Sequence, residues 1–596
     1  MMDAETPGVG DEVRPYKIRV SSKYLDLTRQ KLELTRLPHE GSAPSSADWW
    51  EPKPQVEPLI DYWLDKYSWR DQEAALNEAL PQFRTAITLS AFEKPVRLHF
   101  IRVTSPHANA VPLLLIPPFP LTNLSLGHLV KPLTEPEDAA NNQPFHLVIP
   151  SLPGLGFSDP LPNNTSIIST IAEVLNTLMA RLSYPHYLAT NSGAASQSPA
   201  EIDWKLVNTL ATRYSTSCLG AHFIAPPLST PKISEAPWEW TKWSIANFFR
   251  AGILGYDDSD FQALNRTYVP WSVGKRPPTP QQFGLNKLGL TEPNTLAYAL
   301  CDSPIGLLVF VMKGLRALGP TSNFTPEQVI TFTELAWLPG PEYAMRFWAY
   351  CATHDEDEER KEKEKKAAAQ AAKPRVAITV FLGGKDAPVA PQGDVELTAL
   401  PPPLRTDDKQ KYVCPAWANA HYNVLHTQRV AGKPGLLAWE QPEVIFKGVR
   451  GLAKQILRLD KRLAPGITAP TAAEPAPLQK VVVIPASDSS ENAGGPSTPA
   501  NALSPVTDSD ATPKPGLKVP ESTRPGLAPT PSGQKDSDQT VVSTSNKDIV
   551  NTSSDKGKGK DLEVPKKPFC EGSTPDTLIS SSPMAMTPSP SPIAAA

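Results

Sequence analysis

Short runs of apolar residues alternate along the chain with longer stretches in which apolar residues recur at three- and four-residue intervals. The runs predict buried strands at residues 96–103, 111–117, 145–150 and 186–190. The longer stretches predict helices at residues 166–182 and 203–214. Continuous apolar strands separated by helices are typical of a parallel sheet that is covered on both faces. The first half of the chain therefore predicts an α/β fold.

This alternation stops after residue 225 and resumes later in the chain. A Trp-rich helical pattern extends from there to about residue 350. Strand and helix signals return at residues 375–384, 422–426 and 442–457. Two helical patterns, at residues 17–34 and 56–79, precede the first strand. The pattern predicts a doubly wound, mostly parallel sheet that follows two N-terminal helical segments and has a helical lid inserted in its middle.

The composition of the C-terminal segment differs from that of the rest of the chain. The 67 prolines of the 596-residue sequence thicken after about residue 463, where Pro, Ser, Thr and Ala dominate. Such a segment buries too little apolar surface to offset its ordering entropy, so it is predicted to be disordered. A charged run at residues 354–373 predicts an exposed helical insertion, with a partner-binding helix as the alternative.

These signals predict seven segments along the chain. They are a disordered N-terminus (1–15), a meander (16–90), the first half of the core (91–225), the lid (226–352), the charged insertion (353–374), the second half of the core (375–465) and a disordered tail (466–596). The tail is the segment in which binding sites for unidentified proteins are expected.

Charge and motif content narrow the class of protein. A formal net charge of −4 argues against nucleic-acid binding. Five cysteines without metal-ligand spacing indicate a reduced compartment. The sequence shows neither a signal peptide nor an 18-residue apolar run, which predicts a cytoplasmic protein without a membrane span. It also shows no phosphate-binding glycine loop and no metal-ligand cluster, so no cofactor and no metal are expected.

Four segments of the sequence match one family: DYWLDKYSWRDQEAALNEALPQF (61–83), PSLPGLGFSDP (150–160), TLAYALCDSPIGLL (295–308) and AWEQPE (438–443). Over roughly residues 16–460 the chain resembles the microsomal-type epoxide hydrolases, which are α/β-hydrolases with an N-terminal meander and a lid. The resemblance implies hydrolysis of an epoxide to a vicinal diol. A carboxylate attacks an epoxide carbon to form an ester, two lid tyrosines donate to the opening oxygen, and a histidine with a supporting acid activates water.

The family's nucleophile should follow the strand at residues 186–190, on a sharp turn into a helix. Ungapped alignment places Gly193 there, and glycine has no carboxylate. Asp203, which is followed by Trp204, is a candidate displaced nucleophile if about ten residues are inserted before it. Alternatively, Asp203 caps the helix that begins there. Ser192 lacks the GxSxG pattern of a serine nucleophile.

The groups that should stabilise the opening oxygen are also altered. Where the family carries a His-Gly-aromatic-Pro loop, the chain reads Pro117-Pro118-Phe119-Pro120. Pro118 has no N–H to donate. The two lid-tyrosine positions align with Leu285 and Trp348. Leucine donates no hydrogen bond, and tryptophan donates only through its indole N–H.

The family's general base lies in a Gly-Gly-His-Phe loop just before the AWE motif, and its position in this chain is Gly435. His426, which is predicted to end a strand, is a candidate displaced base or else has a structural role. Asp386, in the turn GGKD after a predicted strand, is the candidate supporting acid or simply bounds that turn. Only the supporting acid therefore remains plausible at its family position.

Three interpretations follow from these substitutions. The chain is an epoxide hydrolase with a displaced nucleophile and base, a non-catalytic hydrolase-fold protein that binds a small apolar or epoxide-bearing ligand in its lid cavity, or an interaction scaffold whose tail recruits partners. Because function depends on the site rather than on the fold, the substituted positions predict that catalysis is impaired or absent.

Overall fold

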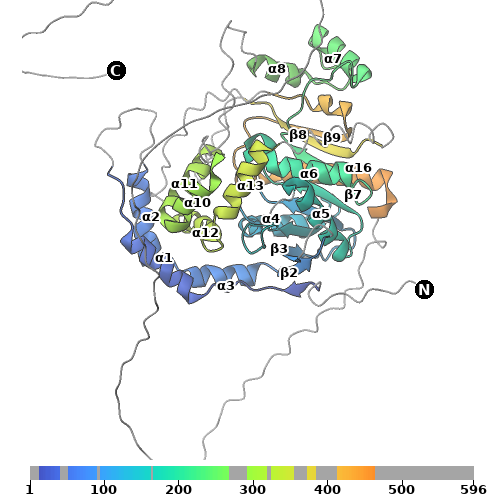
Figure 1. Cartoon of the computed structure of the whole chain (residues 1–596). Helices are drawn as coiled ribbons and strands as arrows, with labels where there is room; N and C mark the ends of the chain where they lie inside the picture. Colours follow the sequence, from blue (N-terminus) through green and yellow to red (C-terminus); the bar gives the residue numbers. More distant parts are fainter. Residues whose placement is uncertain are drawn as a thin grey trace, which may run out of the picture. The chain divides into compact units, whose positions relative to one another are not determined.

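The computed structural model shows an α/β core beside a group of helices (Figure 1). The structure describes residues 12–39, 52–89, 94–162, 166–267, 291–318, 324–354, 372–383 and 412–463. Several predicted features lie outside these ranges: Leu285, Asp386, the tail at 466–596, most of the N-terminal segment 1–15 and most of the charged insertion at 353–374.

In the described part of the chain the core is a nine-stranded sheet with the order β1-β2-β3-β5-β4-β6-β7-β8-β9. The strands are β1 (Arg14–Pro15), β2 (Gln82–Ile87), β3 (Val96–Val103), β4 (Val111–Ile116), β5 (Phe145–Pro150), β6 (Tyr187–Asn191), β7 (Cys218–Ile224), β8 (Arg375–Phe381) and β9 (Asn423–Val430). The pairs from β5 to β9 are parallel, and those from β1 to β5 along the other edge are antiparallel. The predicted mostly parallel sheet is confirmed, although the sequence pattern does not predict β2 or β7.

Helices cover both faces of this sheet. Successive residues of a strand point to opposite sides, so each strand contributes side chains to two separate clusters. On β4, Leu114 packs in a cluster with helices α5 (Ile167–Arg181) and α6 (Ile202–Arg213), whereas Leu113 packs in the cluster of α4 (Gly127–Thr134) and α16 (Pro442–Leu459). All the side chains of β4 are buried, as expected for a strand covered on both faces.

Six described helices lie in the sequence between β7 and β8. They are α7 (Pro237–Phe249), α8 (Asp258–Thr267), α10 (Pro293–Asp302), α11 (Pro304–Leu318), α12 (Pro326–Trp337) and α13 (Glu342–Thr353). Within the described ranges no single helix is both long and apolar enough to cross a bilayer. The pair formed by α10 and α11 meets the length and composition requirement only jointly, and it bends by 116° at the break.

The N-terminal helices pack against this inserted region. They are α1 (Ser22–Leu34), α2 (Lys53–Asp65) and α3 (Trp69–Ala79). The prediction of one helix over residues 56–79 is wrong, because the Ser68 side chain accepts a hydrogen bond from the Asp71 N–H and caps a new helix there. Trp63 of α2 donates its indole N–H to the Glu334 carboxylate of α12 at 3.1 Å, which ties the N-terminal segment to the lid.

Candidate functional site

The connection from β6 to α6 differs from a tight strand-to-helix elbow. After Asn191 the chain forms two short 3-10 turns before α6 begins at Ile202. Ala200 and Glu201 have φ values of 51° and 57°, in the left-handed region that non-glycine residues rarely adopt. The sharp turn into the helix therefore lies at these two residues rather than at Gly193, as the inserted residues in the sequence suggest.

The Asp203 side chain lies close to Gly193, the position at which the sequence alignment expects the nucleophile. Its Oδ2 lies 3.6 Å from the point where a Cβ on Gly193 would stand. Its Oδ1 accepts a hydrogen bond from the Phe119 backbone N–H at 3.0 Å. The alternative that Asp203 caps α6 is wrong, because Asp203 is the second residue of the helix and its carboxylate is turned towards the loop at residues 117–120. The structure thus brings together Asp203, Gly193 and this loop.

The environment of Asp203 opposes its ionisation. The side chain is only 1% exposed. Burial raises the pKa of Asp203 to about 7, although the hydrogen bonds from Phe119 and Ser198 lower it in part. A carboxyl group with this pKa is largely protonated below neutral pH, and only the anion attacks an epoxide carbon. Its geometry suits a hydrogen-bonded brace at least as well as a nucleophile.

Lid helix α13 closes over the loop at residues 117–120. The Phe119 ring packs edge-on against Phe347, with 5.1 Å between centroids, and against Trp348 at 6.3 Å. Trp348, which the resemblance aligns with one of the lid tyrosines, is 2% exposed. Pro118 lies against Gly193, since a Cβ on that glycine would be 3.3 Å from the Pro118 Cβ. Apolar packing therefore occupies the space around the expected oxyanion donors.

The position expected for the general base cannot accept a side chain as it stands. Gly435 has a φ of 58°, which favours glycine. The Glu440 carboxylate fills the place where a Cβ on Gly435 would lie. A histidine at this position would need a strained backbone and a displaced Glu440. Two family positions, Gly193 and Gly435, thus each have a carboxylate from further along the chain beside them, which the sequence alone did not reveal.

The structure does not place the candidate His426 at the end of a strand. β9 continues to Val430, so His426 is in mid-strand, and its ring lies where a side chain on Gly451 of α16 would be. Burial lowers the pKa of His426. The expected position of His426 at a strand end is therefore wrong. Because α16 covers the face of the sheet opposite α6, His426 lies on the other face from the helix that carries Asp203.

His222 of β7, whose imidazole is fully buried, was not identified from the sequence. Its two ring nitrogens contact the hydroxyl groups of Thr190 at 3.0 Å and Thr379 at 2.8 Å. Burial lowers the pKa of His222 to about 3, so the ring is neutral. It also packs against Gly448 of α16. His222 therefore links three neighbouring strands, and the apolar run around it in the sequence gives no sign of this role.

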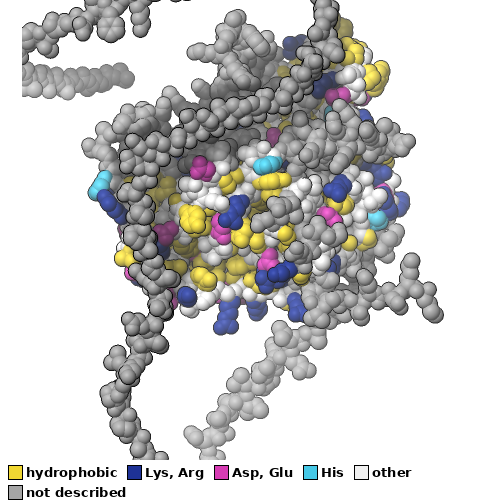
Figure 2. All heavy atoms as spheres, viewed as in Figure 1, with side chains coloured by type: hydrophobic (Ala, Val, Ile, Leu, Met, Phe, Trp, Pro, Cys, Tyr) yellow, Lys and Arg dark blue, Asp and Glu magenta, His cyan; other side chains and the backbone are white. Residues whose placement is uncertain are grey.

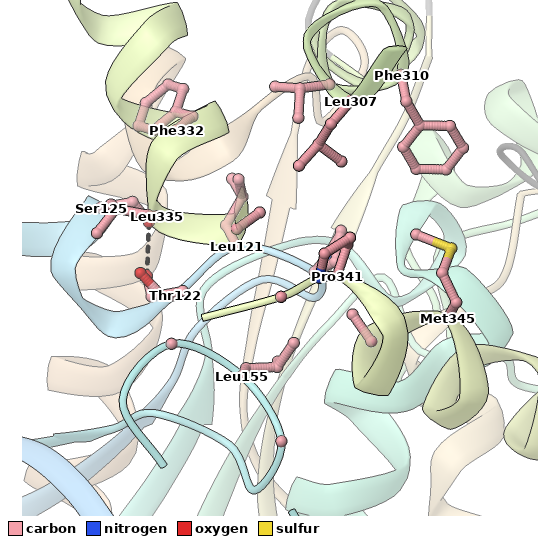
Figure 3. Close-up of a pocket in the computed structure, with 17 residues that line it drawn as sticks. Leu121, Thr122, Ser125, Leu155, Leu307, Phe310, Phe332, Leu335, Pro341 and Met345 are labelled. Carbon is pink, nitrogen blue, oxygen red and sulfur yellow. Dashed lines mark hydrogen bonds between the residues drawn. The ribbon is translucent and has the colours of Figure 1, made fainter. Parts of the chain in front are cut away.

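A cavity of about 60 Å³ lies between the lid and the loops of the core (Figure 3). Leu307 and Phe310 of α11 lie above it and Leu155 below it, with Phe332 and Met345 at its sides. The lining is largely apolar. Asp203, Gly193 and Gly435 are not among the residues that line this cavity in the described part of the chain.

One polar group of this cavity is unusual. The Thr122 hydroxyl is buried and has no hydrogen-bond partner among the described residues. The Thr122 carbonyl is occupied, because it accepts from the Ser125 hydroxyl at 2.6 Å. Buried hydroxyl groups normally have partners, so the Thr122 hydroxyl is an exception among the described residues.

Comparisons with known proteins agree on the class. A family model described as "Epoxide hydrolase N terminus" matches residues 13–126. Juvenile hormone epoxide hydrolase 1 of Ctenocephalides felis is 24% identical over 50% of this chain and 59% of its own length. The match with epoxide hydrolase 1 of Sus scrofa is 23% identical over 55% of this chain and 70% of that protein. The chain thus spans less than two thirds of the length of some of its relatives.

The fold has a close counterpart among solved structures. The Aspergillus niger epoxide hydrolase superposes with a TM-score of 0.52 at 18% identity, over 76% of this chain and 99% of that one. The sheet, with helices on both faces and a helical insertion after β7, defines an α/β-hydrolase. The N-terminal match and the sequence relatives support membership of the epoxide hydrolase family.

Proposed function

We propose that this protein keeps the epoxide hydrolase fold and an apolar cavity beneath its lid, but does not turn over epoxides by the family's ester route. The observation that carries the proposal is the base position. Gly435 has no side chain, and the Glu440 carboxylate occupies the space that a side chain would need. Without a base to activate water, an ester formed at a carboxylate is not hydrolysed at a useful rate.

The state of Asp203 supports the same proposal. Its carboxyl group is buried, accepts a hydrogen bond from the Phe119 N–H and has a raised pKa, so below about pH 7 it stabilises the loop at residues 117–120 largely in its neutral form. Loss of both the nucleophile and the base of a covalent mechanism usually reduces kcat by several orders of magnitude. The Asp203 carboxyl then has a structural role.

The cavity indicates the class of ligand. Its walls are largely apolar, and one lining residue, Thr122, has a buried hydroxyl without a hydrogen-bond partner among the described residues. A small apolar molecule with an ether or epoxide oxygen fits this chemistry. A volume of about 60 Å³ holds only a few water molecules. A larger ligand would therefore enter only with a shift of α11 or α13.

The experiment compares turnover and binding in the full-length protein. We expect diol formation from styrene oxide at the buffer rate for both the wild type and Asp203→Asn. We expect styrene oxide and ethylbenzene to raise the melting temperature of the wild type. The matched control is Ala336→Phe, which fills the cavity from α12 and should abolish the thermal shift. Turnover at an enzyme-like rate, or no shift with either compound, would contradict the proposal.

A second candidate function rests on one distance. Because the Asp203 Oδ2 lies 3.6 Å from the Cβ point of Gly193, Asp203 is placed to act as a displaced nucleophile once ionised. In that case the wild type hydrolyses styrene oxide, activity rises with pH through about 7, and Asp203→Asn abolishes it. Asp386 would then remain the candidate supporting acid, whereas the base would be a group other than His426, because His426 packs against α16 on the opposite face of the sheet from α6.

A further inference from the structure

Helix α7 exposes a stripe of large apolar side chains. Trp238, Ile245, Phe248 and Phe249 are 66%, 40%, 81% and 65% exposed. At 100° of rotation per residue these four side chains fall within an arc of about 100° on one side of the helix. Figure 2 shows hydrophobic side chains gathered over α7 at the upper right of the molecule. The stripe continues past the helix in the exposed Ile253–Leu254 segment.

The opposite side of α7 is firmly packed, so the stripe does not result from a loosely attached helix. Ala246 is completely buried. The Trp243 ring lies 5.2 Å from the Trp417 ring and 5.4 Å from the Tyr256 ring, measured between centroids. It also stacks on Phe261 of α8 at 6.2 Å. The helix is therefore held firmly on one side, and its apolar outer face points away from these contacts with the described residues.

The charges around the stripe nearly cancel one another. Lys242 pairs with Glu239 at 2.8 Å and lies over the ring of Trp238. Arg250 is exposed at the end of the helix, beside the two phenylalanines. Asp257 and Asp258, in the turn that follows, are also exposed. Attraction of a strongly charged partner thus contributes little, and any affinity of this face depends on burial of its apolar side chains.

The size of the stripe decides between a protein partner and a lipid surface. At about 150–250 Å² for a fully exposed large side chain, the exposed fractions of the four side chains of the stripe amount to roughly 500 Å² of accessible apolar surface. A stable protein interface buries about 800 Å² on each partner. A bilayer makes no such demand, because an interfacial helix needs only to insert its apolar face about 5–10 Å into the headgroup region. Tryptophan is also enriched at that depth.

We propose that the outer face of α7 docks into the interfacial region of a lipid bilayer. Trp238, Ile245, Phe248 and Phe249 enter the lipid, while the packing of Trp243 holds the helix against the body of the protein. This attachment is peripheral, and it is independent of whether the protein retains turnover. It places the lid region next to a phase in which apolar compounds concentrate.

The experiment is flotation of the full-length protein with phosphatidylcholine vesicles, with and without 30% phosphatidylserine. We expect the wild type to float with both, and the anionic lipid to change binding by less than about fivefold, the effect of one uncompensated charge. The double variant Phe248→Ser, Phe249→Ser should bind at least about tenfold more weakly. Tyr298→Ser removes an 82% exposed aromatic from α10 and should bind like the wild type.

The outcomes separate lipid from other occupants. Wild-type protein that stays in the aqueous fraction overturns the proposal, as does equal flotation of the wild type and the double variant. Analytical ultracentrifugation supplies the remaining comparison. A dimer that disappears in the double variant, without flotation of the wild type, would show that this face joins two copies of the chain and would also overturn the lipid assignment.

Discussion

Asp203→Asn should change the pH dependence of stability in a defined direction. The pKa of Asp203 is raised to about 7 in the folded protein, against about 3.8 for an exposed aspartate, so folding favours the protonated form. The penalty for ionising the buried group is absent well below pH 3.8. It grows as the pH rises through this window and levels off above about 7, where both states are ionised.

The magnitude follows from the two pKa values. At 1.36 kcal/mol for each pKa unit, the penalty is about 0.5 kcal/mol at pH 4 and about 4 kcal/mol at pH 8. Asparagine has no such penalty, and its side-chain oxygen can still accept from the Phe119 N–H. The free energy of unfolding of the variant, minus that of the wild type, should therefore increase by roughly 3 to 4 kcal/mol from pH 4 to pH 8.

Urea unfolding followed by tryptophan fluorescence at both pH values measures this difference. The control is Asp460→Asn. Hydrogen bonds from Arg462 and Arg375 hold the pKa of Asp460 well below its usual range, so its contribution is almost fully present at both values. That variant should lose a similar amount of stability at pH 4 and pH 8. If Asp203→Asn instead destabilises the protein more at pH 8 than at pH 4, folding lowers the pKa of Asp203 rather than raising it, and the neutral brace is refuted.

Two further substitutions test the surroundings of the site. Gly435→His should lower the free energy of unfolding by about 1–3 kcal/mol and restore no hydrolysis, because the left-handed backbone strains any side chain there and the Glu440 carboxylate must move aside. An active and stable variant would contradict this. Asp260→Asn should cost about 3–5 kcal/mol in urea unfolding, since it leaves Arg429 of a buried, bidentate ion pair without its partner. Glu33→Gln, in an exposed helical pair, should cost under about 1 kcal/mol, and equal losses would refute the distinction.

Much of the core could be predicted because its signals are local. The apolar run at residues 96–103 is β3 with the same bounds, and the pattern at residues 166–182 is α5 to within a residue at each end. The break between α2 and α3 was missed because Ser68 caps a helix inside a continuous apolar periodicity. β9 was predicted too short, because the polar residues after His426 belong to a strand that is only partly buried.

The arrangement of the site is less local, and the sequence could not supply it. The absence of side chains at Gly193 and Gly435 is visible in the sequence. The Asp203 side chain lies beside Gly193 because Ala200 and Glu201 adopt left-handed backbone conformations. Neither residue is a glycine, so the sequence does not predict a turn there. The Glu440 carboxylate lies beside Gly435, five residues earlier in the chain, and the sequence spacing of the two residues does not predict this contact.

Oxygen-isotope labelling of Asp203 tests the central claim most directly. In the ester route a carboxylate oxygen forms a bond to the epoxide carbon, water then attacks the carboxyl carbon, and the carboxylate keeps an oxygen from water. The full-length protein is incubated with excess styrene oxide in ¹⁸O-water and digested, and the peptide that contains Asp203 is weighed by mass spectrometry. We predict no heavy oxygen in this peptide beyond that of a sample without epoxide. Epoxide-dependent labelling of Asp203 would show that the ester route operates and would contradict the loss of turnover.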